Sequence, residues 1–134
     1  MTIPIKTDEE IVLMRESCAI TATILEELKE IVKPGISTED INQYVHERII
    51  AEGGTPSTLH YRGFPKSCCT SVNEVICHGI PSPHVVLRHG DIINVDVTTY
   101  KQGFHGDASV MFLVGGEKAC TPEARELVQP RQRL

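Results

Sequence analysis

The stretch that decides the fold is residues 90–114, which read GDIINVDVTTYKQGFHGDASVMFLV. Its first part is rich in β-branched residues, and the apolar Ile93, Val95 and Val97 alternate with polar side chains, which is the period of a strand with one buried face. Residues 101–103 predict a short turn, because the glycine can adopt the left-handed conformation of a type I turn with a bulge. The chain then runs back, so we expect an antiparallel hairpin.

Asp96 and Asp107 lie one on each expected strand of this hairpin. A turn centred between Lys101 and Gln102 places the two carboxylates opposite each other on the same face. Facing like charges destabilise a sheet unless a cation lies between them, and in proteins this cation is usually a divalent metal ion. Spacing alone leaves two interpretations open: a pair of metal ligands, or two ordinary aspartates on a solvated strand face.

Two amphipathic helices are expected before the hairpin. Thr7 and Glu10 match a capping box that starts the first helix, and Ser37 or Thr38 caps the second, which ends at Gly53-Gly54. Apolar residues recur at three- and four-residue steps, as one buried helix face requires. In the first helix they are Ile11, Met14, Cys18, Thr21, Leu25, Leu28 and Val32, and in the second Ile41, Val45, Ile49 and Ile50.

The remaining segments predict short elements. Residues 69–75 are a strand candidate, and Thr121-Pro122 opens a third helix that Pro130 stops. Helices combined with antiparallel strands in this order indicate the α+β class, with two amphipathic helices packed on an antiparallel sheet.

Composition limits the possible partners. The 134 residues suit one globular domain, and a net charge of -5 with no basic stripe disfavours nucleic-acid binding. No apolar run approaches the length of a membrane span and no signal-peptide pattern is present, so we expect no membrane partner. Five cysteines without framework spacing indicate reduced thiols in a cytoplasmic protein.

His78 is the histidine of most interest, because it follows a strand-like run and precedes Gly79-Ile80-Pro81. Side chains at strand ends often form sites on a rigid scaffold, although a purely structural histidine is the alternative. A zinc site built from Cys68, Cys69, Cys77 and His78 is a further alternative. Adjacent cysteines do not match the usual spacing of zinc ligands, which disfavours it.

Three blocks of sequence resemble type I methionine aminopeptidases. They are residues 61–81 (YRGFPKSCCTSVNEVICHGIP), 90–97 (GDIINVDV) and 103–112 (GFHGDASVMF), and residues 33–38 (KPGIST) between the first two helices also match. The resemblance extends from residue 3 to about residue 129. It implies the N-terminal half of a pita-bread fold, an α+β architecture with two pseudo-symmetric halves around a dinuclear metal centre.

The resemblance also implies an activity, namely hydrolytic removal of the initiator methionine from nascent chains whose second residue is small. Asp96 would ligate one divalent metal ion and Asp107 would bridge two, which could be cobalt, manganese, iron or zinc. His78 would contact the scissile amide or the leaving amine as a catalytic residue. The implied lining of the methionine pocket is Thr58, Tyr61, Phe64 and Cys69 together with His78, and the implied monovalent cation site, for sodium or potassium, is at Asn73 and Val75.

The chain departs from the family pattern in its second half. Family members supply further metal ligands, one histidine and two glutamates, from residues beyond those that match here. We therefore expect a domain over residues 1–129 followed by an unrelated tail over residues 130–134, with weak metal binding and little activity. The implied partners are the N-terminus of a nascent chain at the ribosome and either a separate C-terminal half or a second copy of the chain.

Three alternatives to this enzyme stay open. The first is a pita-bread half-domain without catalysis that binds proteins, although such members typically lose the residues equivalent to Asp96, Asp107 and His78. The second is a half-domain that associates with itself. The third is another pita-bread enzyme, such as a proline dipeptidase, and the block over residues 61–81 favours the methionine-specific branch over it.

Overall fold

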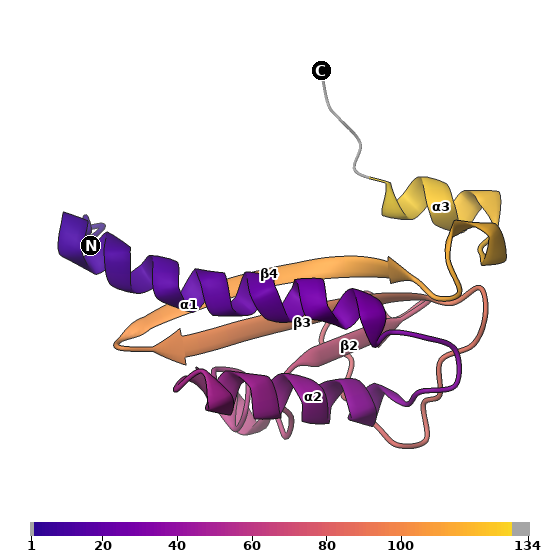
Figure 1. Ribbon diagram of the computed structural model, residues 1–134, viewed down its shortest axis with the longest axis horizontal. Coiled ribbons are helices and arrows are strands. Elements are labelled where there is room, and N and C mark those ends of the chain that lie inside the picture. Colours follow the sequence, from indigo (N-terminus) through magenta and orange to yellow (C-terminus); the bar gives the residue numbers. More distant parts are fainter. Residues whose placement is uncertain (1, 130–134) are drawn as a thin grey trace.

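The computed structural model describes residues 2–129 and has two layers (Figure 1). One layer is a four-stranded antiparallel sheet. The other consists of helices α1 (Asp8–Glu27) and α2 (Thr38–Ala51), which cross the same face of the sheet. A short helix, α3 (Pro122–Val128), lies beyond the end of β4. This arrangement confirms the expected α+β class.

Strand β3 (Ile92–Lys101) is the centre of the sheet. Strand β4 (Phe104–Leu113) pairs with it along one edge, and β2 (Cys69–Val72) and β1 (Thr55–Pro56) pair in succession along the other. Single-turn 3-10 helices lie at Leu28–Glu30, Tyr61–Gly63 and Glu117–Ala119. Within residues 2–129, no helix is long and apolar enough to cross a membrane.

The predicted hairpin forms, but its register differs from the expected one. Asp96 pairs with Ser109, and Asp107 pairs with Thr98. The reason is the turn: it has only two residues, Gln102 and Gly103, and both have positive φ, at 51° and 88°. Because the shift from the expected pairing is two residues, both carboxylates remain on one face.

The core lies between β3 and the two long helices. Ile93, Val95 and Val97 of β3 are fully buried against them, while the residues between these three face the opposite side of the sheet. The helices contribute Ile24, Ile41, Val45 and Ile49, and the 3-10 turn after α1 contributes Leu28, all fully buried. The alternation expected for residues 92–100 is therefore confirmed, and it gives the sheet one buried face and one open face.

The expected buried face of α1 was partly wrong. Cys18 and Ile11 are exposed, and Ser17, Ile20 and Ile24 are buried in their place. Thr21 is buried as expected, whereas Ser17 was missed: its hydroxyl donates to backbone carbonyls of β3 and β4, a contact that apolar periodicity does not reveal.

The boundaries of the helices also differ in detail. The α-helical part of α1 ends at Glu27, before the expected Val32, and in α2 the side chain of Ile50 is half exposed. Both capping boxes form, with Thr7 and Ser37 as the N-cap residues. The third helix begins at Pro122 after the N-cap Thr121, as expected. Its expected stop at Pro130 and the tail over residues 130–134 lie outside the described residues.

An ion pair joins the two long helices. The guanidinium of Arg48 on α2 donates to both carboxylate oxygens of Glu27 on α1, at 2.8 and 3.0 Å, and Tyr44 donates a third hydrogen bond at 2.8 Å. The hydrogen bonds from Arg48 lower the pKa of Glu27 below its ordinary value of 4.5. The stability that this group contributes is thus present above pH 4.5 and is lost as the pH falls through the lowered pKa.

Helix α1 packs tightly against the sheet at Gly106 of β4. The Thr21 hydroxyl donates to the carbonyl oxygen of Gly106 at 2.8 Å, and the Ser17 hydroxyl donates to that of Phe104 at 2.9 Å. A methyl group at position 106 would overlap the backbone of Ser17 and Cys18. Glycine is needed here for close packing of a helix on a strand, since backbone atoms cannot yield as side chains do.

Gly106→Ala is expected to lower the free energy of unfolding by about 2–3 kcal/mol, because α1 has to move away from β4. Urea unfolding monitored by circular dichroism measures the change. Ser109→Ala, an exposed position on the same strand, is the matched control and should change the midpoint little. Equal stability of the two variants would contradict the packing argument.

Candidate active site

The open face of the sheet carries the carboxylate pair. Asp96 and Asp107 are diagonal neighbours on β3 and β4, and Thr98 links the strands by donating its hydroxyl to Asp107 Oδ1 at 2.9 Å. Asp96 is also directly opposite Cys69 on β2. The alternation of β3 therefore brings residues of three strands to one place, on the side away from α1 and α2.

The two carboxylates repel each other in this arrangement. Burial raises the pKa of Asp96 above its ordinary value of 3.8, the charge of Asp107 and a hydrogen bond shared with it raise the pKa further, and His78 opposes the rise. A carboxylate that is held beside another carboxylate gains most from a bound cation. The electrostatics of the pair thus fit a metal-binding role.

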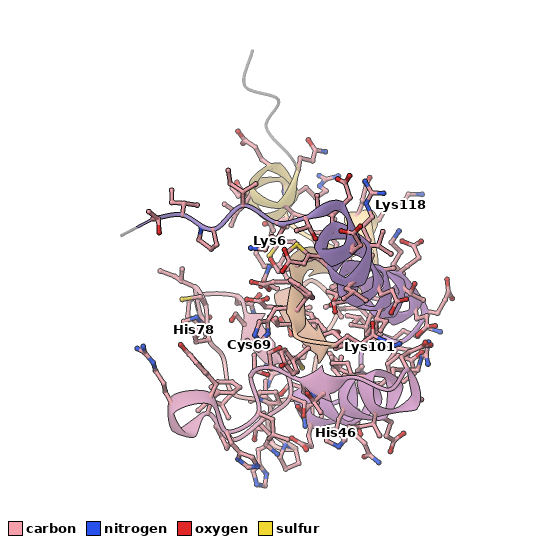
Figure 2. The ribbon with its side chains drawn as sticks, turned by 90° about the vertical axis from the view of Figure 1, so that its left-hand side faces the viewer. Lys6, His46, Cys69, His78, Lys101 and Lys118 are labelled. Atoms are coloured by element: carbon pink, nitrogen blue, oxygen red, sulfur yellow. The ribbon has the colours of Figure 1, made fainter. Side chains whose placement is uncertain are left out.

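His78 reaches this face because the residue after it is fastened to β2. Gly79 accepts a hydrogen bond from Thr70 N–H at 2.9 Å and donates one to the Ser71 hydroxyl at 3.1 Å. A methyl group at position 79 would overlap the carbonyl oxygen of Thr70. His78 itself has φ 55°, a left-handed conformation that is rare for a residue with a side chain. Figure 2 shows His78 and Cys69 on the side of the sheet opposite the helices.

Two adjoining cavities open beside these residues, and Thr58, Tyr61, Cys69 and His78 line both. The larger, of about 530 Å³, has mostly apolar walls. The smaller, of about 410 Å³, contains the two aspartates. The further lining of the larger cavity is Arg62, Gly63, Phe64, Pro65 and Ile80, and that of the smaller is Ser57, Asp96, Thr98, His105 and Asp107. The structure thus brings together all the pocket and metal residues that the resemblance implied.

Cys69 lies where the two cavities meet. Burial, together with the charge of Asp96, raises the pKa of its thiol to about 11. The side chain is therefore a neutral, weakly polar wall at neutral pH, which suits contact with an apolar ligand.

Sequence reasoning missed Ser57, Thr98 and His105 as members of this site. His105 lies two residues before Asp107 and so shares its face of β4, and its Nδ1 lies 2.8 Å from the Ser57 hydroxyl. The alternation of β4 was the signal that could have found it. Ser57 enters through a loop, for which no comparable periodicity exists.

The implied cation residues lie elsewhere. Asn73, at the end of β2, has φ 51°, and its side chain accepts from Ile92 N–H and donates to Asp91. The Val75 N–H donates to the carbonyl oxygen of Val72 at 3.1 Å. Neither residue is part of the lining of the two cavities.

Residues 2–129 hold no group of three or more histidine, cysteine or acidic side chains that could bind a metal ion. The zinc alternative was therefore wrong, since Cys68 is fully buried, whereas Cys69 lies on the open face and Cys77 is exposed. Asp96 and Asp107 supply hard oxygen donors for divalent ions but only part of a coordination shell.

Comparison with known proteins adds a family. Residues 12–130 match the model of metallopeptidase family M24. The chain is 48% identical over 133 residues to a methionine aminopeptidase of Haemophilus influenzae, covering 98% of this chain and 49% of the relative. It is 47% identical over 126 residues to the methionine aminopeptidase of Escherichia coli, covering 90% of this chain and 48% of that protein. The chain thus spans about half the length of these curated relatives.

A solved structure agrees with the sequence comparison. The fold superimposes on the crystal structure of methionine aminopeptidase from Rickettsia prowazekii with a TM-score of 0.90 and 38% sequence identity, covering 96% of this chain and 50% of that one. The architecture described above therefore corresponds to half of a pita-bread fold.

Gly79→Ala is expected to release residues 76–80 from β2, because the added methyl group overlaps the Thr70 carbonyl oxygen. Amide hydrogen exchange should rise at Thr70 and the His78 ring signals should shift, with little change in β4. Gly63→Ala, in the 58–66 loop, is the control: its positive φ of 83° makes the substitution strained, but nothing lies within 4 Å of the added methyl group, so it does not push against β2. Unchanged His78 signals in Gly79→Ala would refute this account of how the ring is positioned.

Asp96→Asn is expected to stabilise the metal-free chain at pH 7 by about 0.5 kcal/mol, because it removes the repulsion between diagonally neighbouring carboxylates. A carboxyl whose pKa is raised on folding favours the folded state below its ordinary pKa of 3.8 and loses that contribution as the pH rises through the raised pKa. The advantage of the variant should thus appear as the pH rises above about 4 and disappear in more acidic buffer. Thermal unfolding across this range in the presence of a chelator measures it, and a variant less stable than the parent at pH 7 would contradict the argument.

Proposed function

The chain belongs to metallopeptidase family M24, and we propose that it provides the methionine pocket and the first metal ligands of a methionine aminopeptidase. The reaction is hydrolytic removal of an N-terminal methionine when the second residue is small. The observation that carries the proposal is the pair of joined cavities, one apolar and one containing Asp96 and Asp107, with His78 lining both.

The apolar cavity is proposed to select the methionine side chain. Tyr61, Phe64, Cys69 and Ile80 contribute the apolar part of its lining. An unbranched thioether fits such a slot without leaving a buried polar group unpaired, whereas a charged side chain would lose its hydration. Binding the side chain here directs the scissile bond toward the carboxylates in the adjoining cavity.

The second cavity is proposed to carry the chemistry. Asp96 and Asp107 would hold divalent ions, and the hydrogen bond from Thr98 orients the Asp107 carboxylate for this. When bound, such ions supply an activated water and polarise the carbonyl that it attacks. His78 contacts the scissile amide and positions it, and its location between the cavities supports this role. Manganese, iron, cobalt and zinc all suit carboxylate ligands.

The remaining parts of the proposal concern partners and location. The substrate is the N-terminus of a nascent chain at the ribosome, and a monovalent cation, sodium or potassium, binds near Asn73 and Val75. Free cysteines throughout residues 2–129 support a cytoplasmic location. The further metal ligands come from a second half, which is part of a longer protein, a separate chain or a second copy of this one.

Metal binding by the 134-residue chain tests the carboxylate pair. Manganese added to the isotope-labelled chain is expected to broaden the amide signals around positions 96 and 107, with weak affinity, because two carboxylates do not complete a shell. Asp107→Asn should abolish the effect. Asp8→Asn, which removes the same charge from the start of α1, is the control and should leave it unchanged. Broadening that is insensitive to Asp107→Asn would refute the proposed site.

Turnover and ligand selection test the rest of the proposal. The chain alone is expected to release little or no methionine from a Met-Ala-Ser peptide, and robust metal-dependent turnover would show that no second half is needed. L-methionine should shift the signals of Tyr61, Phe64 and Cys69 more than L-leucine does. Equal responses to the two amino acids would argue against a methionine pocket.

A further inference from the structure

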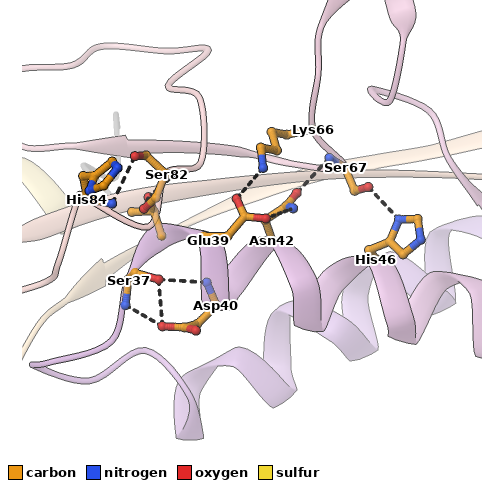
Figure 3. Close-up of polar contacts among 10 residues, drawn as sticks. Ser37, Glu39, Asp40, Asn42, His46, Lys66, Ser67, Ser82 and His84 are labelled. Atoms are coloured by element: carbon orange, nitrogen blue, oxygen red, sulfur yellow. Dashed lines mark hydrogen bonds and ion pairs between the residues drawn. The ribbon is translucent and has the colours of Figure 1, made fainter.

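A cluster of polar side chains on α2 faces the segment that leads into β2 (Figure 3). Glu39, Asn42 and His46 follow one another at three- and four-residue steps, so they share one face of the helix. Their common partners are the consecutive residues Lys66 and Ser67. This cluster lies outside the two cavities, and neither the metal ligands nor the pocket lining include its helical members.

The contacts of the cluster are short and largely buried. The backbone N–H of Ser67 donates to Asn42 Oδ1 at 2.8 Å, and the two residues are 2% and 7% exposed. The Ser67 hydroxyl lies 2.8 Å from His46 Nδ1. Asn42 Nδ2 donates to Glu39 Oε1 at 3.2 Å, so the Asn42 amide is fixed with its oxygen toward Ser67.

An ion pair completes the cluster. Lys66 Nζ lies 2.6 Å from Glu39 Oε2, and both side chains are more than two-thirds buried. Glu39 Oε2 is buried and has no hydrogen-bond partner within residues 2–129, so the ammonium group of Lys66 is the group that compensates the charge of this carboxylate. An ion pair shielded in this way is stronger than an exposed one.

The cluster connects directly to the cavity wall. The carbonyl oxygen of Lys66 accepts a hydrogen bond from the hydroxyl of Thr58, a residue that lines both cavities. This bond closes the loop over residues 58–66, which carries Tyr61 and Phe64. The other end of the loop is fixed where Ser57 N–H donates to the carbonyl oxygen of Thr98 on β3, at 2.9 Å.

We propose that Glu39, Asn42 and His46 are positioning residues that hold the 58–66 loop at a set distance from β2, and so set the width of the apolar cavity. The cavity is lined by residues of this loop together with Cys69 of β2 and His78, which come from other segments of the chain. Ser67 precedes Cys69 by two residues, so the contact with α2 fixes the loop and the start of β2 together. The inference rests on the proposed methionine pocket, whose selectivity the width determines.

Asn42→Ala in the 134-residue chain is the central test, because it leaves the buried N–H of Ser67 without its acceptor. Amide hydrogen exchange over residues 58–66 is expected to rise about tenfold relative to β3, the factor that corresponds to loss of one buried hydrogen bond. L-methionine binding, followed by amide shifts, should weaken more than L-leucine binding, since the longer side chain contacts more of the displaced wall.

Two further variants separate positioning from general destabilisation. Glu39→Gln combined with Asn42→Asp keeps an acceptor for Ser67 N–H and the same number of carboxylates. Amide exchange over residues 58–66 should therefore be slow in this double variant, unlike in Asn42→Ala. Gln43→Ala, on the exposed side of α2, is the matched control and should leave the 58–66 loop unchanged. If Asn42→Ala does not fold, Ser67→Ala removes only the hydroxyl contact with His46 and should produce a smaller change in the same direction.

The outcomes distinguish this inference from the proposed function. If exchange over residues 58–66 of Asn42→Ala rises no more than exchange in β3, the positioning role is overturned. Where the parent chain binds methionine, the role is also overturned if Asn42→Ala has the same ratio of methionine to leucine affinity as the parent. A parent chain that binds neither amino acid would overturn the methionine pocket instead. The exchange measurement would still decide whether α2 holds the loop.

Discussion

The alternation of β3 is the constraint on which both the core and the candidate site depend. Its odd-numbered residues from Ile93 to Thr99 are buried beneath α1 and α2, and the even-numbered residues between them face the opposite side. Burial of the first set fixes the register, because a slip of one residue would place Asp96 in the core. The helices therefore hold the carboxylate in place without touching it, and the partner strands add Cys69 and Asp107 to the same face.

The sequence predicted the elements well wherever local chemistry determines them. The capping box at Thr7, the cap at Ser37, the proline at the start of α3 and the hairpin depend on residues close in the chain, and all of them form. The register was wrong because a left-handed Gln102 shortens the turn, and glutamine carries no strong turn signal. The buried face of α1 was partly wrong because polar Ser17 is held there by backbone carbonyls of distant strands.

Outside the hairpin, the site was predictable only through resemblance. Asp96 and Asp107 could be placed on one face from strand periodicity, but the residues of the 58–66 loop and His78 could not be placed beside them by any periodic pattern. His78 depends on Gly79 lying against β2, and the loop depends on polar contacts with α2. Contacts of this kind join segments far apart in the chain, so they become visible only when the fold is known.

Gly106 links the scaffold to the chemistry in a way that bears on protein engineering. It stands between His105 and Asp107, and the absence of a side chain there is what lets α1 lie against β4. Libraries that diversify residues 105–107 as one motif would mix loss of folding with change of activity and so would be hard to interpret. The 58–66 loop, fastened at its two ends, offers a segment that can be replaced as a unit while the strands and their carboxylates keep their places.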